Sequence, residues 1–154
     1  PQDRSSAASD VYKRQTLNVQ LEEDIDIVVD ASAFSIILSN FVTNALKHSP
    51  SNSEILIKND LEDDFLTTLS VIDHGKGIPK KYRDRVFERF FRVDKGRAKH
   101  SGGTGLGLAI SKHLARLMGY EVGMKPNKPN GSRFWISVNY ASSEEEKSLT
   151  PELA

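Results

Sequence analysis

The chain has 154 residues, with 21 basic and 21 acidic side chains and no cysteine. This length suits one domain with its own core, and the balanced charge gives no electrostatic footprint for nucleic acid or an anionic membrane surface. Disulfides, thiolate metal sites and cysteine nucleophiles are excluded, and no apolar run is long enough to cross a bilayer, so we expect a soluble globular domain without direct membrane contact.

The first part of the chain predicts two strands and one long helix. Residues 1–15 are polar and unpatterned, and we interpret them as a disordered or non-native leader. Alternating apolar and polar residues predict a strand over 17–21, and a shorter strand is expected over 25–29. Apolar residues recur at intervals of three and four over 31–48, which predicts an amphipathic helix. Pro50 ends this helix because proline cannot continue the hydrogen-bond ladder.

The middle of the chain predicts two further strands, a short helix, a loop and a second long helix. The strands cover 54–59 and 65–72 and are joined by an acidic turn. Pro79 suits the first position of a short helix. Residues 93–104 are rich in basic side chains and glycine, which indicates a mobile loop, and the apolar spacing over 106–118 predicts a helix.

The last predicted strands, 121–125 and 132–140, close a domain that we expect to span 16–140. Residues 141–154 carry a run of glutamates and are interpreted as a polar tail. Strands often follow one another directly, and a regular alternation of strand and helix is absent. This pattern favours an α+β fold, with helices on one face of a mostly antiparallel sheet.

Two asparagines lie on one face of the first long helix. Asn40 and Asn44 are four residues apart, and Lys47 and His48 continue the same stripe about one turn later. Asparagine is a mediocre helix former, so its repetition beside an apolar stripe calls for a reason. An amide oxygen can ligate Mg²⁺, and a lysine ammonium can contact phosphates. An ordinary polar face is the alternative that this stripe alone leaves open.

Asp73, Gly75 and Gly77 directly follow an apolar strand. A carboxylate at the end of such a strand is costly unless a partner pairs with it, and an exocyclic amine such as that of adenine could be that partner. The glycines would let the backbone turn and approach a flat ring closely. Taken alone, these residues fit a plain turn with a capping aspartate at least as well.

A run of glycines precedes the second long helix. Residues 102–108 read Gly-Gly-Thr-Gly-Leu-Gly-Leu. Glycines before a helix expose backbone N–H groups to an anion, which the helix dipole also attracts. The run lacks the features of a P-loop and of a dinucleotide fingerprint, and a flexible linker is the alternative.

Upstream, residues 86–92 interleave phenylalanine with arginine. Such a stretch could be a core patch, a hinge for the loop that follows or a strip that stacks on RNA bases. The balanced charge of the chain argues against RNA binding.

Together and in this order, these features resemble the ATP-binding catalytic domain of sensor histidine kinases, within the superfamily shared with gyrase, the chaperone Hsp90 and the mismatch-repair protein MutL. The matching stretches are 40–50 (N box), 73–79 (first glycine box), 86–92 (F box), 103–110 (second glycine box) and 130–134 (closing motif). The resemblance covers roughly 16–140 and rests on motifs in the order and at the spacing typical of that family.

The resemblance implies a Bergerat-type two-layer sandwich of about three helices on a mixed five-stranded sheet, with Mg·ATP between the layers and 93–104 as a lid. Asp73 would accept the adenine amine, helped by Ser132 through a water. Asn44 would ligate Mg²⁺, and the implied catalytic residues are Asn40, Lys47 and Arg92. The implied nucleotide-binding residues are Asn40, Asn44, Lys47, His48, Asp73, Gly75, Gly77, Gly103, Thr104, Gly105, Leu106, Gly107 and Ser132.

The activity that the resemblance implies is donation of the γ-phosphoryl group to a histidine on a separate dimerisation and phosphoacceptor domain. That histidine would in turn supply the receiver domain of a response regulator, in bacterial two-component signalling. None of the four histidines of the chain lies in the acceptor setting of the family, so the acceptor is expected elsewhere. A cytoplasmic location is implied, and many relatives of this kind are membrane-anchored.

Two alternatives are weighed against this reading. An ATPase of the gyrase, Hsp90 or MutL type, or a serine kinase of the anti-sigma type, would place a glutamate general base where this chain has Asn40. An amide cannot accept the proton of an attacking water or serine, which disfavours that alternative. A catalytically silent nucleotide-binding module is the second alternative, although all the binding positions are intact.

Overall fold

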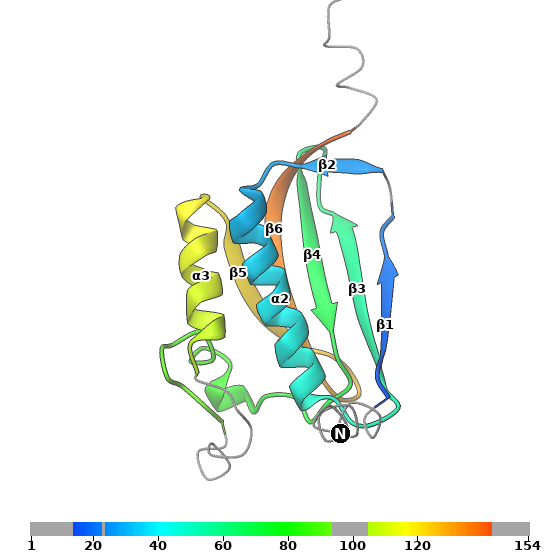
Figure 1. Cartoon of the computed structure of the whole chain (residues 1–154), viewed down its shortest axis with the longest axis vertical. Helices are drawn as coiled ribbons and strands as arrows, with labels where there is room; N and C mark the ends of the chain where they lie inside the picture. Colours follow the sequence, from blue (N-terminus) through cyan, green and yellow to red (C-terminus); the bar gives the residue numbers. More distant parts are fainter. Residues whose placement is uncertain (1–13, 23, 94–104, 143–154) are drawn as a thin grey trace, which may run out of the picture.

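In the part of the chain that the structure describes, two α-helices lie on one face of a six-stranded β-sheet (Figure 1). The computed structural model describes residues 14–22, 24–93 and 105–142. The strands are β1 (Thr16–Gln20), β2 (Ile25–Ile27), β3 (Glu54–Leu61), β4 (Leu66–Ile72), β5 (Glu121–Pro126) and β6 (Ser132–Ser142). The helices are α2 (Ala31–His48) and α3 (Gly107–Leu117), and a short 3-10 helix, η1, covers Lys80–Tyr82.

The sheet is mixed, as the sequence predicts. Its strand order is β1-β3-β4-β6-β2, and β5 pairs with a different part of β6. Only the pair formed by β1 and β3 is parallel among the described strands, and the other four pairs are antiparallel. The long strand β6 therefore binds β4 along one side and both β5 and β2 along the other. This arrangement brings the end of β4 next to the turn between β5 and β6.

The predicted elements agree with the structure to within two residues at each end, and α2 has the predicted bounds. The predicted acidic turn is shorter than expected, because β3 continues to Leu61 and pairs it with Thr67 of β4. The sheet has six strands where five were expected. About three helices were expected, but the region after Pro79 forms η1 and successive i→i+3 turns, so the described residues hold two α-helices.

The expected ends of the domain are only partly described. Gln15, which the sequence places in the leader, donates from its side chain to the carbonyl oxygens of Leu46 and Ser49 at the end of α2. Ala141, placed in the predicted tail, lies within β6. Most of both end segments lies outside the described residues, and the domain limits 16–140 stay a prediction. No helix among the described residues is long and apolar enough to span a membrane.

The core lies between α2, α3 and the sheet. Its buried members are Ile37, Phe41, Ala45, Ile55, Ile57, Val71, Val86, Ala115, Phe134, Ile136 and Val138. The rings of Phe41 on α2 and Phe134 on β6 lie with their centroids 5.7 Å apart. Burial of each large side chain of this kind contributes about 1.5–3 kcal/mol, so these contacts fix α2 firmly over the sheet.

Both ends of α2 are defined by local hydrogen bonds. The Asp30 carboxylate accepts from the Ala33 N–H at 2.9 Å and caps the first turn. At the other end, Ser49 donates to the Ala45 carbonyl oxygen from both its N–H and its hydroxyl. The position of α2 along the sheet, and with it the position of its polar stripe, is thereby set by the residues on either side of the helix.

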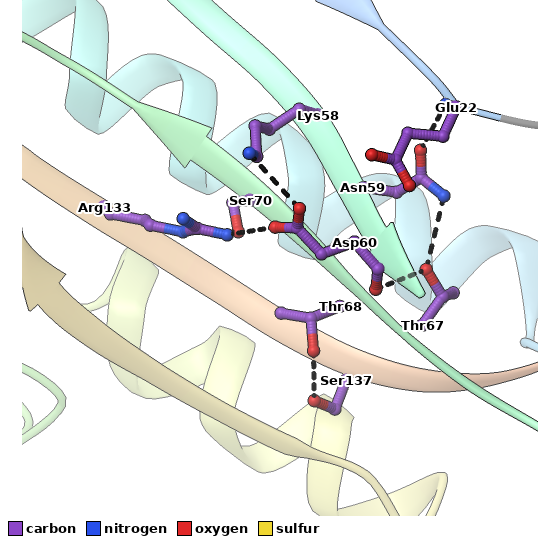
Figure 2. A network of polar contacts seen from close by, with 9 residues as sticks. All are labelled: Glu22, Lys58, Asn59, Asp60, Thr67, Thr68, Ser70, Arg133 and Ser137. Atoms are coloured by element: carbon purple, nitrogen blue, oxygen red, sulfur yellow. Dashed lines mark hydrogen bonds and ion pairs between the residues drawn. The ribbon is translucent and has the colours of Figure 1, made fainter. Parts of the chain in front are cut away.

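Polar side chains of β3, β4 and β6 interact on the face of the sheet opposite to the helices (Figure 2). Asp60 on β3 forms ion pairs with Lys58 and with Arg133 of β6, and Arg133 also donates to the Ser70 hydroxyl. Thr68 and Ser137 share a further hydrogen bond across β4 and β6. Partly exposed pairs of this kind contribute little stability individually, about 0–1 kcal/mol. They nevertheless explain why β3 extends through Asp60 instead of turning there.

Candidate functional site

Asp73 follows β4 directly, and its carboxylate is buried, with 2% of the residue exposed. Its Oδ1 accepts from the N–H groups of Gly75 at 2.9 Å and Ser132 at 3.2 Å. Burial raises the pKa of the Asp73 carboxyl, although these two hydrogen bonds and the nearby charges of His48 and His74 act in the opposite direction. The fold therefore holds a carboxylate in a place where water solvates it poorly.

The carboxylate of Asp73 retains an acceptor for a ligand. Both hydrogen bonds that the described residues donate to this group reach Oδ1. Its Oδ2 is therefore left to accept from something else. Oδ2 keeps some access to solvent, since among the described residues only Trp135 Nε1 is a buried side-chain polar atom without a partner. A ligand that donates a hydrogen bond here would therefore replace water at a carboxylate that is otherwise poorly hydrated.

The glycines after Asp73 fit close contacts with neighbouring main chain. A Cβ on Gly75 would lie 2.3 Å from the His48 carbonyl oxygen at the end of α2. Gly77 has a φ of +75°, and a Cβ there would lie 3.0 Å from the Gly131 carbonyl oxygen. The loop after β4 is thus held between the end of α2 and the turn that joins β5 to β6.

Asn40 connects the two helices. Its Nδ2 donates to the Gly107 carbonyl oxygen at 2.9 Å and to the Ser111 hydroxyl at 3.1 Å. Ser111 is fully buried, and its hydroxyl donates to the same Gly107 oxygen at 2.9 Å. A Cβ on Gly107 would lie 3.5 Å from Asn40 Oδ1, so the amide packs against the first turn of α3. The polar stripe of α2 therefore faces the start of α3.

Asn44 and Lys47 lie further along the same stripe, and both are half-buried. Burial and the positive charge of Arg92 lower the pKa of Lys47, so these two cationic side chains lie close enough to interact. No hydrogen bond joins the Asn44 side chain to another described residue. Its amide group is therefore available to a ligand on this side of α2.

The donor set around Asn44 fits Mg²⁺ in one particular way. The described residues contain no group of three or more histidine, cysteine, aspartate or glutamate side chains that could hold a metal ion together. Mg²⁺ commonly takes one or two protein oxygen ligands and completes its shell with substrate phosphates and water. A single amide oxygen would match that mode if phosphates bound beside it.

The start of α3 is open to an anion. Leu106 is its N-cap residue and forms no side-chain cap, in contrast to Asp30 on α2. The first N–H groups of α3 therefore remain for an anion, which the helix dipole would also favour. The main chain before the helix is fixed, because Gly105 has a φ of +72° and its carbonyl oxygen accepts from the Phe90 N–H at 2.8 Å.

The described site residues line one side of α2. Asp73, Gly75, Gly77 and Ser132 lie at its C-terminal end, and the first turn of α3 lies against Asn40. His48 is exposed, and it is near enough to Asp73 for its charge to act on that carboxyl. Gly103, Thr104 and most of the predicted lid lie outside the described residues. Sequence reasoning missed Ser111 and Asn127, which look like ordinary helix and turn residues in the sequence.

Comparison with known proteins identifies the chain at the level of a family. Residues 29–142 match the family model described as histidine kinase-, DNA gyrase B-, and HSP90-like ATPase. The chain is 36% identical over 126 residues to the sensor histidine kinase WalK of Bacillus subtilis and 41% identical over 101 residues to the sensor-like histidine kinase SenX3 of Mycolicibacterium smegmatis. These matches cover 81% and 66% of this chain but 21% and 26% of the two relatives, so the chain spans only about a fifth to a quarter of their length.

Solved structures agree with this assignment. The mycobacterial sensor histidine kinase MprB superposes with a TM-score of 0.74 at 27% identity, over 91% of this chain and 92% of that one. Full-length ShkA, solved in complex with AMPPNP, gives a TM-score of 0.73 at 29% identity, over 92% of this chain and 28% of that one. The likeness to MprB confirms the predicted α+β sandwich. The chain therefore belongs to the family of histidine kinase-, DNA gyrase B- and HSP90-like ATPases, and within it is an ATP-binding catalytic domain of the sensor histidine kinase type.

Proposed function

We propose that this domain binds Mg·ATP along the polar side of α2 and donates the γ-phosphoryl group to a histidine on a separate dimerisation and phosphoacceptor domain. This proposal rests mainly on two different kinds of site that lie at the two ends of the polar stripe of α2, which runs from Asn40 to His48. A buried carboxylate acceptor, Asp73, lies near His48, and the uncapped start of α3 lies at Asn40. His48 lies eight positions after Asn40, or about 12 Å along the helix, which suits a nucleotide with its base at one end and its phosphates at the other.

The adenine end of the site would be formed by Asp73 and its neighbours. Oδ2 of Asp73 would accept a hydrogen bond from the exocyclic amine, and the Ser132 hydroxyl would assist through a water. Because Oδ1 is already held by two N–H groups, the carboxylate does not have to reorganise when the base binds. The close packing of Gly75 and Gly77 against the main chain of His48 and Gly131 would hold the loop after Asp73 in place.

The phosphate end would be formed by cations and main-chain N–H groups. The main chain from Gly105 to Gly107, where α3 begins, would bind phosphate oxygens together with Gly103 and Thr104. Lys47 and Arg92 would add positive charge, and Arg92 would steady the γ-phosphoryl group. The amide oxygen of Asn44 would hold Mg²⁺, which when bound neutralises part of the charge on the phosphates.

The transfer itself requires little covalent chemistry from this domain. A nitrogen of the acceptor imidazole would form a bond to the γ-phosphorus as the bond from that phosphorus to the bridging oxygen breaks, and ADP would leave. The nucleophile brings its own lone pair, so the domain would contribute positioning and charge stabilisation. Asn40 is suited to this role, because its amide nitrogen is committed as a donor to α3 and does not act as a base.

Known relatives support the nucleotide and the acceptor. ShkA was solved with AMPPNP, and the curated relatives are named as sensor histidine kinases. By extension, the partners of this domain would be the phosphoacceptor domain of a longer bacterial protein and the receiver domain of a response regulator, both on the cytoplasmic side. If the domain bound the nucleotide through these residues but transferred no phosphoryl group, it would be a catalytically silent nucleotide-binding module.

The test is a calorimetric titration of the chain with a non-hydrolysable ATP analogue, with and without Mg²⁺, followed by a transfer assay. The assay would add ATP labelled at the γ-position and a separately produced dimerisation and phosphoacceptor domain from a relative. Binding strengthened by Mg²⁺, followed by label on the acceptor histidine, is the expected result. Binding without transfer to any acceptor would leave the silent nucleotide module, and absence of binding at millimolar analogue would contradict the proposal as a whole.

A further inference from the structure

Asn127 lies in the turn between β5 and β6 and ties this turn to the end of β4. Its main-chain N–H donates to the Gly131 carbonyl oxygen at 3.1 Å, which closes the turn. Its side-chain Nδ2 donates to the Asp73 carbonyl oxygen at 3.0 Å. The same nitrogen lies 3.4 Å from the Asn130 carbonyl oxygen and 3.4 Å from His74 Nδ1. One amide group therefore contacts both sides of the junction between β4 and the turn.

The peptide group that follows Asp73 is enclosed by this turn. Gly131 has a φ of +121°, and a Cβ there would lie 1.9 Å from the Asp73 carbonyl oxygen. The Asp73 N–H donates to the Ser132 carbonyl oxygen at 2.9 Å, and the Ser132 N–H donates to Asp73 Oδ1 at 3.2 Å. Ser132 thus holds the nitrogen side of Asp73 and one carboxylate oxygen. Asn127 holds the carbonyl side.

We propose that Asn127 is a positioning residue for base recognition. Asn127 holds the carbonyl side of Asp73 while Ser132 holds the nitrogen side, so the two together fix the main chain on both sides of the Asp73 Cα and thereby the direction in which Oδ2 points. This role rests on the proposed function, because it concerns the contact between Asp73 and an exocyclic amine. The hydrogen bonds of Asn127 reach only the turn itself and the residues after β4, and none reaches α2 or α3 among the described residues, so we expect its effect at the base end of the site.

Two variants separate this role from a general contribution to folding. Asn127→Asp keeps the size of the side chain but replaces the donor Nδ2 with an oxygen. Two acceptor oxygens would then face each other, one from the variant side chain and one from the Asp73 carbonyl. Asn127→Ala removes the contact without adding a charge. The matched control is Asn130→Ala, because Asn130 lies in the same turn, is exposed and takes part through its main-chain oxygen, which alanine retains.

The experiment titrates the full chain and each variant, with Mg²⁺, against three ligands and records the melting temperature of each protein. The ligands are a non-hydrolysable ATP analogue, the corresponding inosine nucleotide with an oxygen in place of the 6-amine, and inorganic tripolyphosphate. Both Asn127 variants are expected to bind the adenine ligand about threefold to tenfold more weakly, as loss of one hydrogen bond would predict. Binding of the inosine ligand and of tripolyphosphate should stay as in the parent, and Asn130→Ala should match the parent with all three.

The outcomes separate this role from the proposed function. If the parent fails to prefer adenine over inosine, the base contact of Asp73 is wrong, and the role of Asn127 fails with it. If the parent prefers adenine and both Asn127 variants keep that preference, only the role of Asn127 is overturned. A lower melting temperature together with an equal loss for all three ligands would assign Asn127 a purely structural part and would also overturn it.

Discussion

Asn40 on α2 and Gly107 at the start of α3 are joined by a hydrogen bond of 2.9 Å, from the asparagine Nδ2 to the glycine carbonyl oxygen. The same Nδ2 also reaches the buried Ser111 hydroxyl. The side chain at position 40 therefore has to donate hydrogen bonds, and an amide can do so where a carboxylate cannot. This requirement distinguishes the chain from ATPases and serine kinases that would hold a glutamate general base at position 40.

Replacing Asn40 with aspartate is expected to lower the free energy of unfolding at pH 7 by about 1–3 kcal/mol, because the bond from Asn40 to the Gly107 carbonyl oxygen is lost and that oxygen would then face a carboxylate. A protonated carboxyl can donate, so the loss should shrink as the pH falls toward about 4, the ordinary pKa of aspartate, and should be smallest below it. Urea unfolding of Asn40→Asp and the parent across pH measures this difference. Ser39→Ala, on the exposed neighbour, is the control. Equal stability of Asn40→Asp and the parent at pH 7 would contradict the role assigned to this contact.

The raised pKa of Asp73 predicts a pH dependence of stability. The folded state holds the Asp73 proton more tightly than the unfolded state does, so this group favours folding below its unfolded pKa. That stabilisation is lost as the pH rises through the folded pKa, where the buried carboxyl has to ionise. Asp73→Asn removes the titration but keeps an oxygen for the N–H groups of Gly75 and Ser132. The variant should therefore gain stability relative to the parent as the pH rises through this window.

The measurement is urea unfolding of Asp73→Asn and of the parent at a series of pH values, with the difference between them plotted against pH. Groups that titrate equally in both proteins cancel in this difference. A difference that rises with pH and then levels off is the expected result. A difference that falls with pH would mean that ionised Asp73 stabilises the fold, against the direction given by its burial.

The same variant should change base preference if Asp73 contacts adenine as proposed. The asparagine places a donor where Oδ2 accepts, so it would oppose the adenine amine and favour the 6-oxygen of an inosine nucleotide. Titration of Asp73→Asn with non-hydrolysable analogues of both nucleotides should show the adenine preference lost or reversed. Retention of the parent preference would place the base elsewhere.

Local patterns predict the helix α2 and most strand bounds, because the apolar spacing and Pro50 after the helix act within a few residues. They also predict that Asn40 and Asn44 share a face. What they cannot predict is the partner of each polar group. Ser111 reads as an ordinary helix residue because its partner, Asn40, lies 71 positions away. Asn127 reads as a turn residue because its partner, Asp73, lies 54 positions away and is brought near by the pairing of β4 with β6.

The glycines of the site show the same limit. Sequence reasoning gave Gly75 the task of letting the backbone approach a flat ring. The structure gives it a more immediate constraint, because the His48 carbonyl oxygen occupies the space where a Cβ would lie. The residue type was recognisable as part of a motif, but the reason depends on a contact with the end of α2 that only the folded chain makes.

Gly75→Ala is expected to destabilise the domain, because its Cβ would lie 2.3 Å from a main-chain oxygen that cannot rotate away. A forced shift of this kind costs about 1–3 kcal/mol, and it would move α2 relative to Asp73. The chain offers a matched control in Gly119→Asn, because Gly119 has a φ of +80° but no atom within 4 Å of a Cβ, and asparagine tolerates that conformation. Thermal unfolding compares the two. Similar melting temperatures for Gly75→Ala and the parent would show that the main chain around His48 moves aside without a loss of stability, which would contradict this prediction.

Asn44→Ala tests the metal ligand separately from the fold. The Asn44 side chain forms no hydrogen bond with another described residue. Its loss should therefore change the free energy of unfolding by no more than about 0.5 kcal/mol, as is usual for surface substitutions, and should barely move the melting temperature. If its amide oxygen holds Mg²⁺, the variant should bind a non-hydrolysable ATP analogue equally well with and without the ion, whereas the parent binds more tightly with it. Thr43→Ala, on the exposed neighbouring position, should retain the full Mg²⁺ effect. If Asn44→Ala shows the same Mg²⁺ effect as the parent, Asn44 is not a ligand of the metal. The base contact of Asp73 would be unaffected by that result, because Asp73 follows β4 and is not part of α2.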